Sequence, residues 1–174
     1  MRSFLCAEFL DFVAQRFPAA AGDGGPCLPA TCLGPGHVRA CADAVAPGCG
    51  VPGPALLQSF GTALFGRLVR GYPAFFVGMR STIDLVSRYE THVAAEVAKL
   101  APAFPLPSLA LVRRKGRPVE VLYRSPDGLA DLAEGLLAGS VAHFEERLRV
   151  TRGRADASGC SARFVLGRRV RTGA

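Results

Sequence analysis

The spacing of hydrophobic residues predicts helices over the first hundred residues of the chain. Apolar side chains recur every three or four positions there, as they do on one face of an α-helix. The clearest stripe includes Val86, Val93 and Val97 and continues to Leu100. Four helices are therefore expected, at residues 2–17, 37–46, 54–69 and 81–100.

The pattern changes after residue 105, where β-type segments replace the helical spacing. Two strands joined by a short turn are expected first, and a second pair follows later. The four strands are residues 108–114, 118–124, about 146–152 and 161–170. Between the pairs, Ser125 and Pro126 are typical of an N-cap followed by proline at the first helical position, so we expect a helix from there to about His143.

The order of these elements predicts one α+β domain over residues 1–174. A length of 174 residues fits a single domain, at roughly 150 residues per domain. A mainly helical part, residues 1–105, is followed by a sheet plus a helix, residues 106–170. We therefore expect an N-terminal helical part and then a four-stranded antiparallel sheet with an inserted helix.

The composition narrows the classes of partner. The formal net charge is +7, but the basic residues form no concentrated motif of the kind that nucleic-acid binding needs. The longest uncharged run, residues 44–66, is interrupted by three prolines and does not predict a membrane span. The first residues carry Glu8 and Asp11 inside the apolar stretch, which argues against an export signal. The sequence thus predicts a cytoplasmic protein that binds neither nucleic acid nor membrane.

The residues with reactive side chains indicate no enzyme class. The three histidines lie far apart, and no glycine-rich phosphate loop precedes a helix. Four cysteines, Cys27, Cys32, Cys41 and Cys49, lie close together, but their spacing differs from that of zinc sites. We predict no metal site and no catalytic residues, and a thiol redox sensor built on these cysteines stays open as one function.

Several strings, taken in order, resemble the heme-nitric-oxide/oxygen binding family, H-NOX. The opening helix MRSFLCAEFLDFV, the segment ALLQSFGTALFGRLVRGYPAFF, the proline turn EVAKLAPAFPLPSL and the string LYRSPDGLADLAEGLLAGSVAHF carry the resemblance, which spans most of the chain. The resemblance implies a heme whose iron is ligated by a histidine of the long helix. It also implies a Tyr-x-Ser-x-Arg motif that binds the heme propionates and a proline that presses on the macrocycle. Gas binding would then be relayed to a separate kinase, cyclase or chemotaxis protein, because no output domain is evident in this sequence.

The position of the axial ligand departs from the family pattern. The family's proline corresponds to Pro107, and counting back without a gap places the ligand position at Ala94. His92 is the alternative axial ligand, two residues earlier in the chain. Two residues correspond to about 200° on an α-helix, so His92 is expected to point nearly opposite to Ala94.

The propionate motif departs as well. Tyr123 and Ser125 match it, but Asp127 stands where the arginine belongs. An arginine pairs with a carboxylate, whereas an aspartate repels one. Arg80 or Arg88 could supply a cation from elsewhere in the chain.

A third departure lies in residues 18–36, which are shorter than in the family and rich in glycine and proline. We expect the distal wall of the heme site to be remodelled or open. Together the departures predict a stand-alone sensor or regulatory domain of the H-NOX type in which canonical heme binding is impaired or lost. A gas sensor that keeps its heme is the alternative, beside the thiol sensor, with His92 as the first candidate ligand. Cys41, Met79 or apolar contact alone are the other ways in which the heme could be held.

Overall fold

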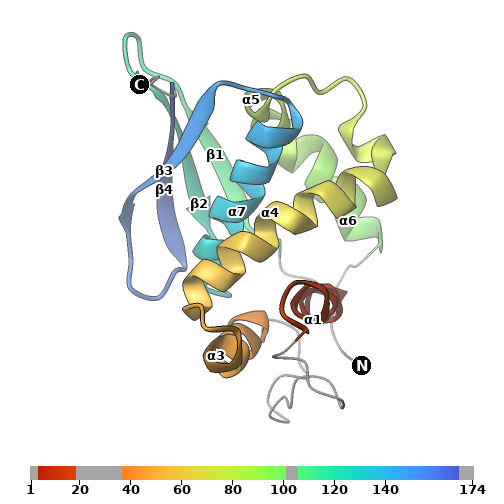
Figure 1. Ribbon diagram of the computed structural model, residues 1–174. Helices are drawn as coiled ribbons and strands as arrows, with labels where there is room; N and C mark the ends of the chain where they lie inside the picture. The colour runs from red at the N-terminus through yellow and green to blue at the C-terminus, as the bar shows by residue number, and fades with distance from the viewer. Residues whose placement is uncertain (1–3, 19–36, 101–105, 169–174) are drawn as a thin grey trace, which may run out of the picture.

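The helical part comes first in the computed structural model, which describes residues 4–18, 37–100 and 106–168 (Figure 1). Helix α1 spans Phe4–Arg16, α3 spans Val38–Cys49 and α4 spans Gly53–Gly71. A single 3₁₀ turn, η2, follows at Pro73–Phe76. The three predicted helices in this region are confirmed, and each begins and ends within a few residues of its expected bounds. None of the described helices combines the length and the hydrophobicity that crossing a bilayer requires.

The prediction of one continuous helix at residues 81–100 is wrong, because the helix is interrupted. It consists of α5 at Thr82–Ser87, a π-helical turn η3 at Tyr89–Val93 and α6 at Ala94–Leu100. The N–H of Val93 donates to the carbonyl of Arg88 at 3.4 Å, a bond five residues back along the chain. A π-turn holds one more residue than an α-turn, so it changes which side chains share a face after it.

The four predicted strands form one antiparallel sheet in the order β1-β2-β4-β3. The strands are β1 (Ser108–Val112), β2 (Val119–Arg124), β3 (Leu148–Ala155) and β4 (Ser161–Arg168). Tyr123 lies opposite Leu109 of β1 and Ala162 of β4, so it sits in the interior of the sheet. The expected α+β architecture is confirmed, with the helices on one side of the sheet (Figure 1).

The helix between the strand pairs begins later than the sequence predicts. Helix α7 spans Ala130–His143, and Ser125 is not its N-cap. Ser125 donates its backbone N–H to the carbonyl of Cys160 at 2.8 Å, and its hydroxyl accepts from the N–H of Asp127. Contacts with the β3–β4 loop thus hold residues 125–129 in a turn that precedes the helix.

Helices α4 and α7 cross at very short range. A Cβ added to Gly135 of α7 would overlap the carbonyl of Gln58 in α4, and one added to Gly139 would lie 2.7 Å from Cβ of Phe65. The hydroxyl of Thr62 in α4 bonds to the carbonyl of Gly135 at 3.2 Å. The small residues therefore let the two backbones meet.

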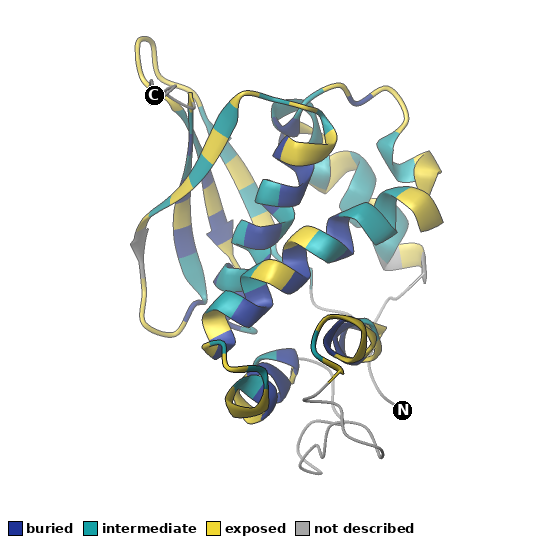
Figure 2. Cartoon of the chain, viewed as in Figure 1, coloured by how far each residue is buried: buried dark blue, intermediate teal, exposed yellow. Residues whose placement is uncertain are grey.

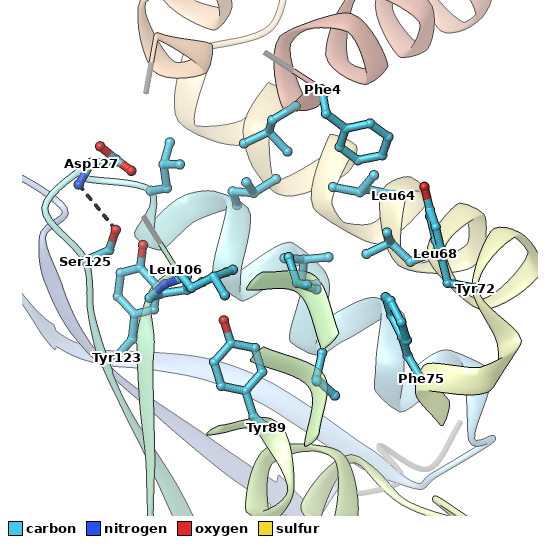
Figure 3. A pocket seen from close by; sticks show the side chains of 18 residues that line it. Phe4, Leu64, Leu68, Tyr72, Phe75, Tyr89, Leu106, Tyr123, Ser125 and Asp127 are labelled. Carbon is cyan, nitrogen blue, oxygen red and sulfur yellow. Dashed lines mark hydrogen bonds between the residues drawn. The ribbon is translucent and has the colours of Figure 1, made fainter. Parts of the chain in front are cut away.

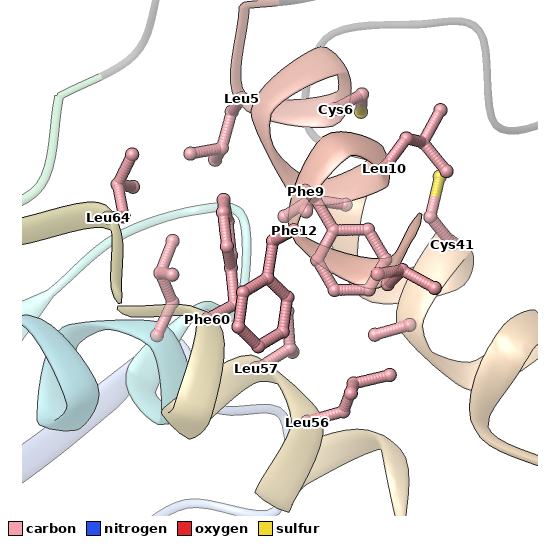
Figure 4. Packing of buried hydrophobic residues seen from close by; sticks show 14 of the residues in the cluster. Leu5, Cys6, Phe9, Leu10, Phe12, Cys41, Leu56, Leu57, Phe60 and Leu64 are labelled. Atoms are coloured by element: carbon pink, nitrogen blue, oxygen red, sulfur yellow. The ribbon is translucent and has the colours of Figure 1, made fainter. Parts of the chain in front are cut away.

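Buried positions recur along α4, α7 and the strands of the sheet (Figure 2). The buried side chains form two clusters. The first joins α1, α3, α4 and the start of α7, and its rings Phe9, Phe12 and Phe60 pack edge-on or tilted (Figure 4). The second lies between α7 and the sheet and includes Tyr123 and Phe164, whose side chains are almost fully buried. The α4–α7 pair is thus the frame to which the sheet and the N-terminal helices are fixed.

Candidate ligand pocket

A cavity of about 340 Å³ lies where the helices meet the end of strand β2 (Figure 3). Its walls come from α1, α4, the turn after α4, the η3–α6 segment, residues 106–107, β2 and α7. Ligand pockets in proteins usually measure about 300–1,000 Å³, so the cavity is large enough for a small ligand. A pocket is therefore present, although the large side chains of Leu64 and Phe75 line it.

Most of the pocket wall is hydrocarbon. Helix α4 contributes Leu64 and Leu68, and α7 contributes Leu132 and Leu136. Among the described residues that line the cavity, Asp127 is the one with a charged side chain. Binding in this space is consequently driven by burial of apolar surface.

The polar groups gather at one end of the pocket, in the segment that leaves strand β2. Tyr123 and Ser125 are buried and Asp127 is half-buried, and all three line the cavity. The N–H of Asp127 donates to Oγ of Ser125 at 3.3 Å, which closes the turn. The structure thus brings together Tyr123, Ser125 and Asp127, the three positions of the predicted propionate motif, in one corner (Figure 3).

The pKa of Tyr123 is raised above its ordinary value. Burial is the main cause, and the charge of Asp127 adds to it, while contacts with the Ser125 side chain and the Leu129 backbone act in the opposite direction. Tyr123 therefore stays a neutral phenol at physiological pH.

Tyr89 is a second tyrosine in the pocket, and it was not predicted from the sequence. Its side chain points in among the lining residues from the π-turn (Figure 3). Burial raises its pKa well above the usual range, and the neighbouring Tyr123 and Glu90 raise it further. The signal was present in the sequence, because Tyr89, Val93 and Val97 are spaced four residues apart.

The helix that should carry the axial ligand presents valines to the pocket. Val93 and Val97 line the cavity, whereas His92 and Ala94, the two positions inferred from the sequence, are half-buried and are not among the lining residues. Adjacent residues on a helix differ by about 100°, so the neighbours of Val93 are turned away from the face that it occupies. Pro107, the expected macrocycle contact, does line the pocket, next to Leu106.

The donor set of the pocket does not fit an axially ligated heme. Heme iron is held in proteins by histidine, cysteine, methionine or tyrosine. No histidine, cysteine or methionine is found among the described lining residues, and the raised pKa values of Tyr89 and Tyr123 keep both phenols protonated. The carboxylate of Asp127 would also meet the propionates with like charge.

No cation replaces the missing arginine among the described residues that line the pocket. Arg80 and Arg88, which the sequence offered as substitutes, are exposed and lie outside the lining. Arg39 of α3 approaches the same turn from another side, where its guanidinium bonds to the carbonyls of Gly128 and Ser158. It holds the turn in place but does not line the cavity.

Of the four cysteines in the proposed thiol sensor, the structure describes two. Cys41 is fully buried in the first core and Cys49 is half-buried at the end of α3, while Cys27 and Cys32 lie outside the described residues. Burial raises the pKa of the Cys49 thiol, which lowers its reactivity. Within the described residues, no group of three or more His, Cys, Asp or Glu side chains is placed to hold a metal ion.

A family profile and the solved structures of similar fold point to the same family. The profile of the family described as Haem-NO-binding matches residues 36–152. No curated protein matches the chain. The fold is similar to that of the unliganded Fe(II) H-NOX protein from K. algicida, with a TM-score of 0.78 and 16% identity over 99% of this chain and 98% of that one.

It is also similar to that of an H-NOX protein from S. oneidensis in the Fe(II)NO state. That comparison gives a TM-score of 0.77 and 19% identity over 97% of this chain and 99% of the other. Both likenesses extend over nearly the whole length of each chain, so the fold includes the N-terminal helices as well as the sheet.

Proposed function

Because the chain belongs to the Haem-NO-binding (H-NOX) family, whose members are heme-based gas sensors, we propose that it is a sensor or regulatory domain in which canonical heme binding is impaired or lost. The observation that carries this proposal is the chemistry of the pocket wall. Val93 and Val97 occupy the helix face that looks into the cavity, and neither can ligate iron.

The charge at the polar end supports the same proposal. A heme buried in this cavity would bring its two propionates towards the corner of Tyr123 and Ser125, where Asp127 lines the wall. Like charges in a partly buried site repel more strongly than in water, because the surroundings screen them less. The missing ligand and the reversed charge therefore weaken heme binding together.

A signalling role follows from the family rather than from a catalytic site. H-NOX domains are sensor domains, and we propose that this one transmits its state to a separate protein, such as a kinase, a cyclase or a chemotaxis protein. The α4–α7 pair and the segment 82–100 both border the pocket. A change in the contents of the pocket would therefore act on elements that reach the surface.

A heme titration followed by absorption spectroscopy tests the proposal. The protein is expressed with a heme supply, purified and titrated with hemin, and the Soret band is recorded before and after addition of nitric oxide. We expect weak, non-saturating binding and the same result for His92→Ala. A stoichiometric band that shifts with nitric oxide and is lost in His92→Ala would instead assign ligation to His92.

A further inference from the structure

We propose that the pocket takes an uncharged, largely apolar ligand with one hydroxyl or carbonyl group, and that Asp127 selects against ligands with an anionic head group. This inference rests on the proposed function, since it concerns what the pocket takes in place of heme. It assigns a ligand class to the cavity and a specificity-determining role to one carboxylate.

The apolar part of the ligand follows from the walls. Val93 and Val97 form one side of the cavity, and Leu64 and Leu136 come from the α4–α7 pair. A hydrocarbon chain or ring system loses its contact with water there without leaving any polar group unpaired. A strongly polar ligand would pay the full cost of desolvation over most of its surface.

The single polar group follows from the hydroxyls. Tyr123 and Ser125 stand at one end of the cavity, and the phenol of Tyr89 is directed into it (Figure 3). Both phenols are kept neutral by burial, so they offer hydrogen bonds without charge. A hydroxyl or a carbonyl oxygen matches these groups, because each can exchange one or two hydrogen bonds with them.

The selection against anions follows from Asp127. It is the one charged side chain among the described lining residues, and it lies at the same end as the hydroxyls. Neither Arg39 nor Arg124, the arginines nearest this turn in the chain or by contact, lines the cavity. Arg39 binds the carbonyls of Gly128 and Ser158, and Arg124 is exposed at the end of β2. A carboxylate head group would enter beside an anion that no pocket-lining cation offsets.

A pair of ligands with the same chain length and different head groups, compared in the wild type and in variants of Asp127, tests the effect of head-group charge. N-phenyl-1-naphthylamine, an uncharged fluorescent probe, is bound to the purified protein and displaced by 1-decanol or by decanoate at about pH 8. At this pH the fatty acid is fully ionised. We expect an apparent Kd for decanol that is at least about tenfold lower than that for decanoate, because like-charge contacts are costly.

Variants of the carboxylate test its role. In Asp127→Asn the two ligands should compete almost equally apart from their intrinsic hydrophobicity, and in Asp127→Arg decanoate should become the better competitor. Asp11→Asn makes the same chemical change on the exposed face of α1 and should leave the wild-type preference intact. Val97→Trp puts a larger side chain on the cavity wall and should weaken displacement by both ligands.

Each outcome decides the inference. Preference for decanol that reverses in Asp127→Arg supports it. Equal competition in the wild type, or a preference that survives in Asp127→Arg, refutes the role of Asp127, and failure of both ligands to displace the probe refutes the ligand class. A hemin titration of the same sample keeps the two proposals apart, because stoichiometric heme uptake would refute the proposed function, whereas absence of both heme and decanol binding would refute this inference alone.

Discussion

The backbone N–H of Asp127 donates to the hydroxyl of Ser125 at 3.3 Å. Ser125, which matches the H-NOX propionate motif, therefore holds in place Asp127, which replaces the arginine of that motif. The bond closes the turn between β2 and α7 and places a carboxylate at the polar end of the pocket. Ser125 is 7% exposed, so water does not readily replace its hydrogen bonds. The turn thus combines a structural and a ligand-selecting role.

Removal of this hydroxyl should cost stability. In Ser125→Ala the N–H of Asp127 loses its acceptor, and Tyr123 loses a polar neighbour. We expect the free energy of unfolding in urea to fall by about 0.5–1.5 kcal/mol, the usual net value of one hydrogen bond. Ser59→Ala, on the exposed side of α4, should change it by less than about 0.5 kcal/mol. Equal effects of the two changes would show that the turn does not depend on Ser125.

The crossing of α4 and α7 should tolerate no side chain at Gly135. Gly135→Ala puts a methyl group onto the carbonyl of Gln58, and separating the helices costs about 1–3 kcal/mol. At Gly66 of α4 an added Cβ meets only the Arg70 guanidinium at 3.5 Å, so Gly66→Ala should stabilise the helix by about 0.5–1 kcal/mol. Thermal unfolding of the two variants should therefore move in opposite directions. A gain in stability from both would contradict the close approach of the helices.

Stability should fall at alkaline pH in a way that depends on Tyr89. A tyrosine in the unfolded chain ionises near pH 10, whereas the raised pKa of Tyr89 keeps it protonated in the folded protein. The unfolded state therefore loses its proton first, and the free energy of unfolding decreases as pH rises above about 10. Urea unfolding between about pH 9 and 11 should show a smaller decrease in Tyr89→Phe than in the wild type.

Tyr72→Phe, which removes an exposed tyrosine, is the matched control for this experiment. It should retain the wild-type decrease of stability with pH. An identical pH dependence in the wild type and in Tyr89→Phe would contradict the burial of the Tyr89 phenol in the folded state.

Thiol chemistry should be slow at the cysteines that the structure describes in α3. Cys41 has no exposed surface, and burial raises the pKa of the Cys49 thiol, which lowers the fraction of reactive thiolate. Brief alkylation of the native protein, read out by peptide mass spectrometry, should leave Cys41 unmodified until urea is added. Rapid and reversible modification of Cys41 in the native protein would instead favour the thiol redox sensor.

Sequence periodicity predicted the parts of the fold in which local and tertiary preferences agree. Helix α4 and the four strands appeared where the pattern placed them, because each buries the face that its own period defines. The predicted start of α7 was wrong. The N–H of Ser125 donates to the carbonyl of Cys160, and its hydroxyl accepts from the N–H of Asp127 and does not cap a helix N-terminus. A local capping signal cannot report a bond to a loop more than thirty residues away.

The pocket face of the long helix was predicted only in part. A regular helix places Glu90 on the stripe of Val86, Val93 and Val97, and it also places Tyr89, four residues before Val93, on that side of the helix. In the structure Tyr89, Val93 and Val97 line the pocket, while Glu90 is exposed and accepts a bond from the hydroxyl of Ser108 at 2.9 Å. The grouping of Tyr123, Ser125 and Asp127 was predicted from the family motif, because neighbours at the end of one strand meet whatever the rest of the chain does.

The central claim is that the pocket lacks the groups that hold heme. Introducing a histidine that could ligate the heme iron tests this claim most directly. Val93→His and Ala94→His, each combined with Asp127→Arg, are titrated with hemin beside the wild type, and the Soret band is followed with and without nitric oxide. The account predicts no stoichiometric band in the wild type and a saturable, nitric-oxide-sensitive band in the Val93→His protein, because Val93 lines the pocket and Ala94 does not. Stoichiometric heme binding by the wild type, or a gain in the Ala94→His protein without one in the Val93→His protein, would contradict it.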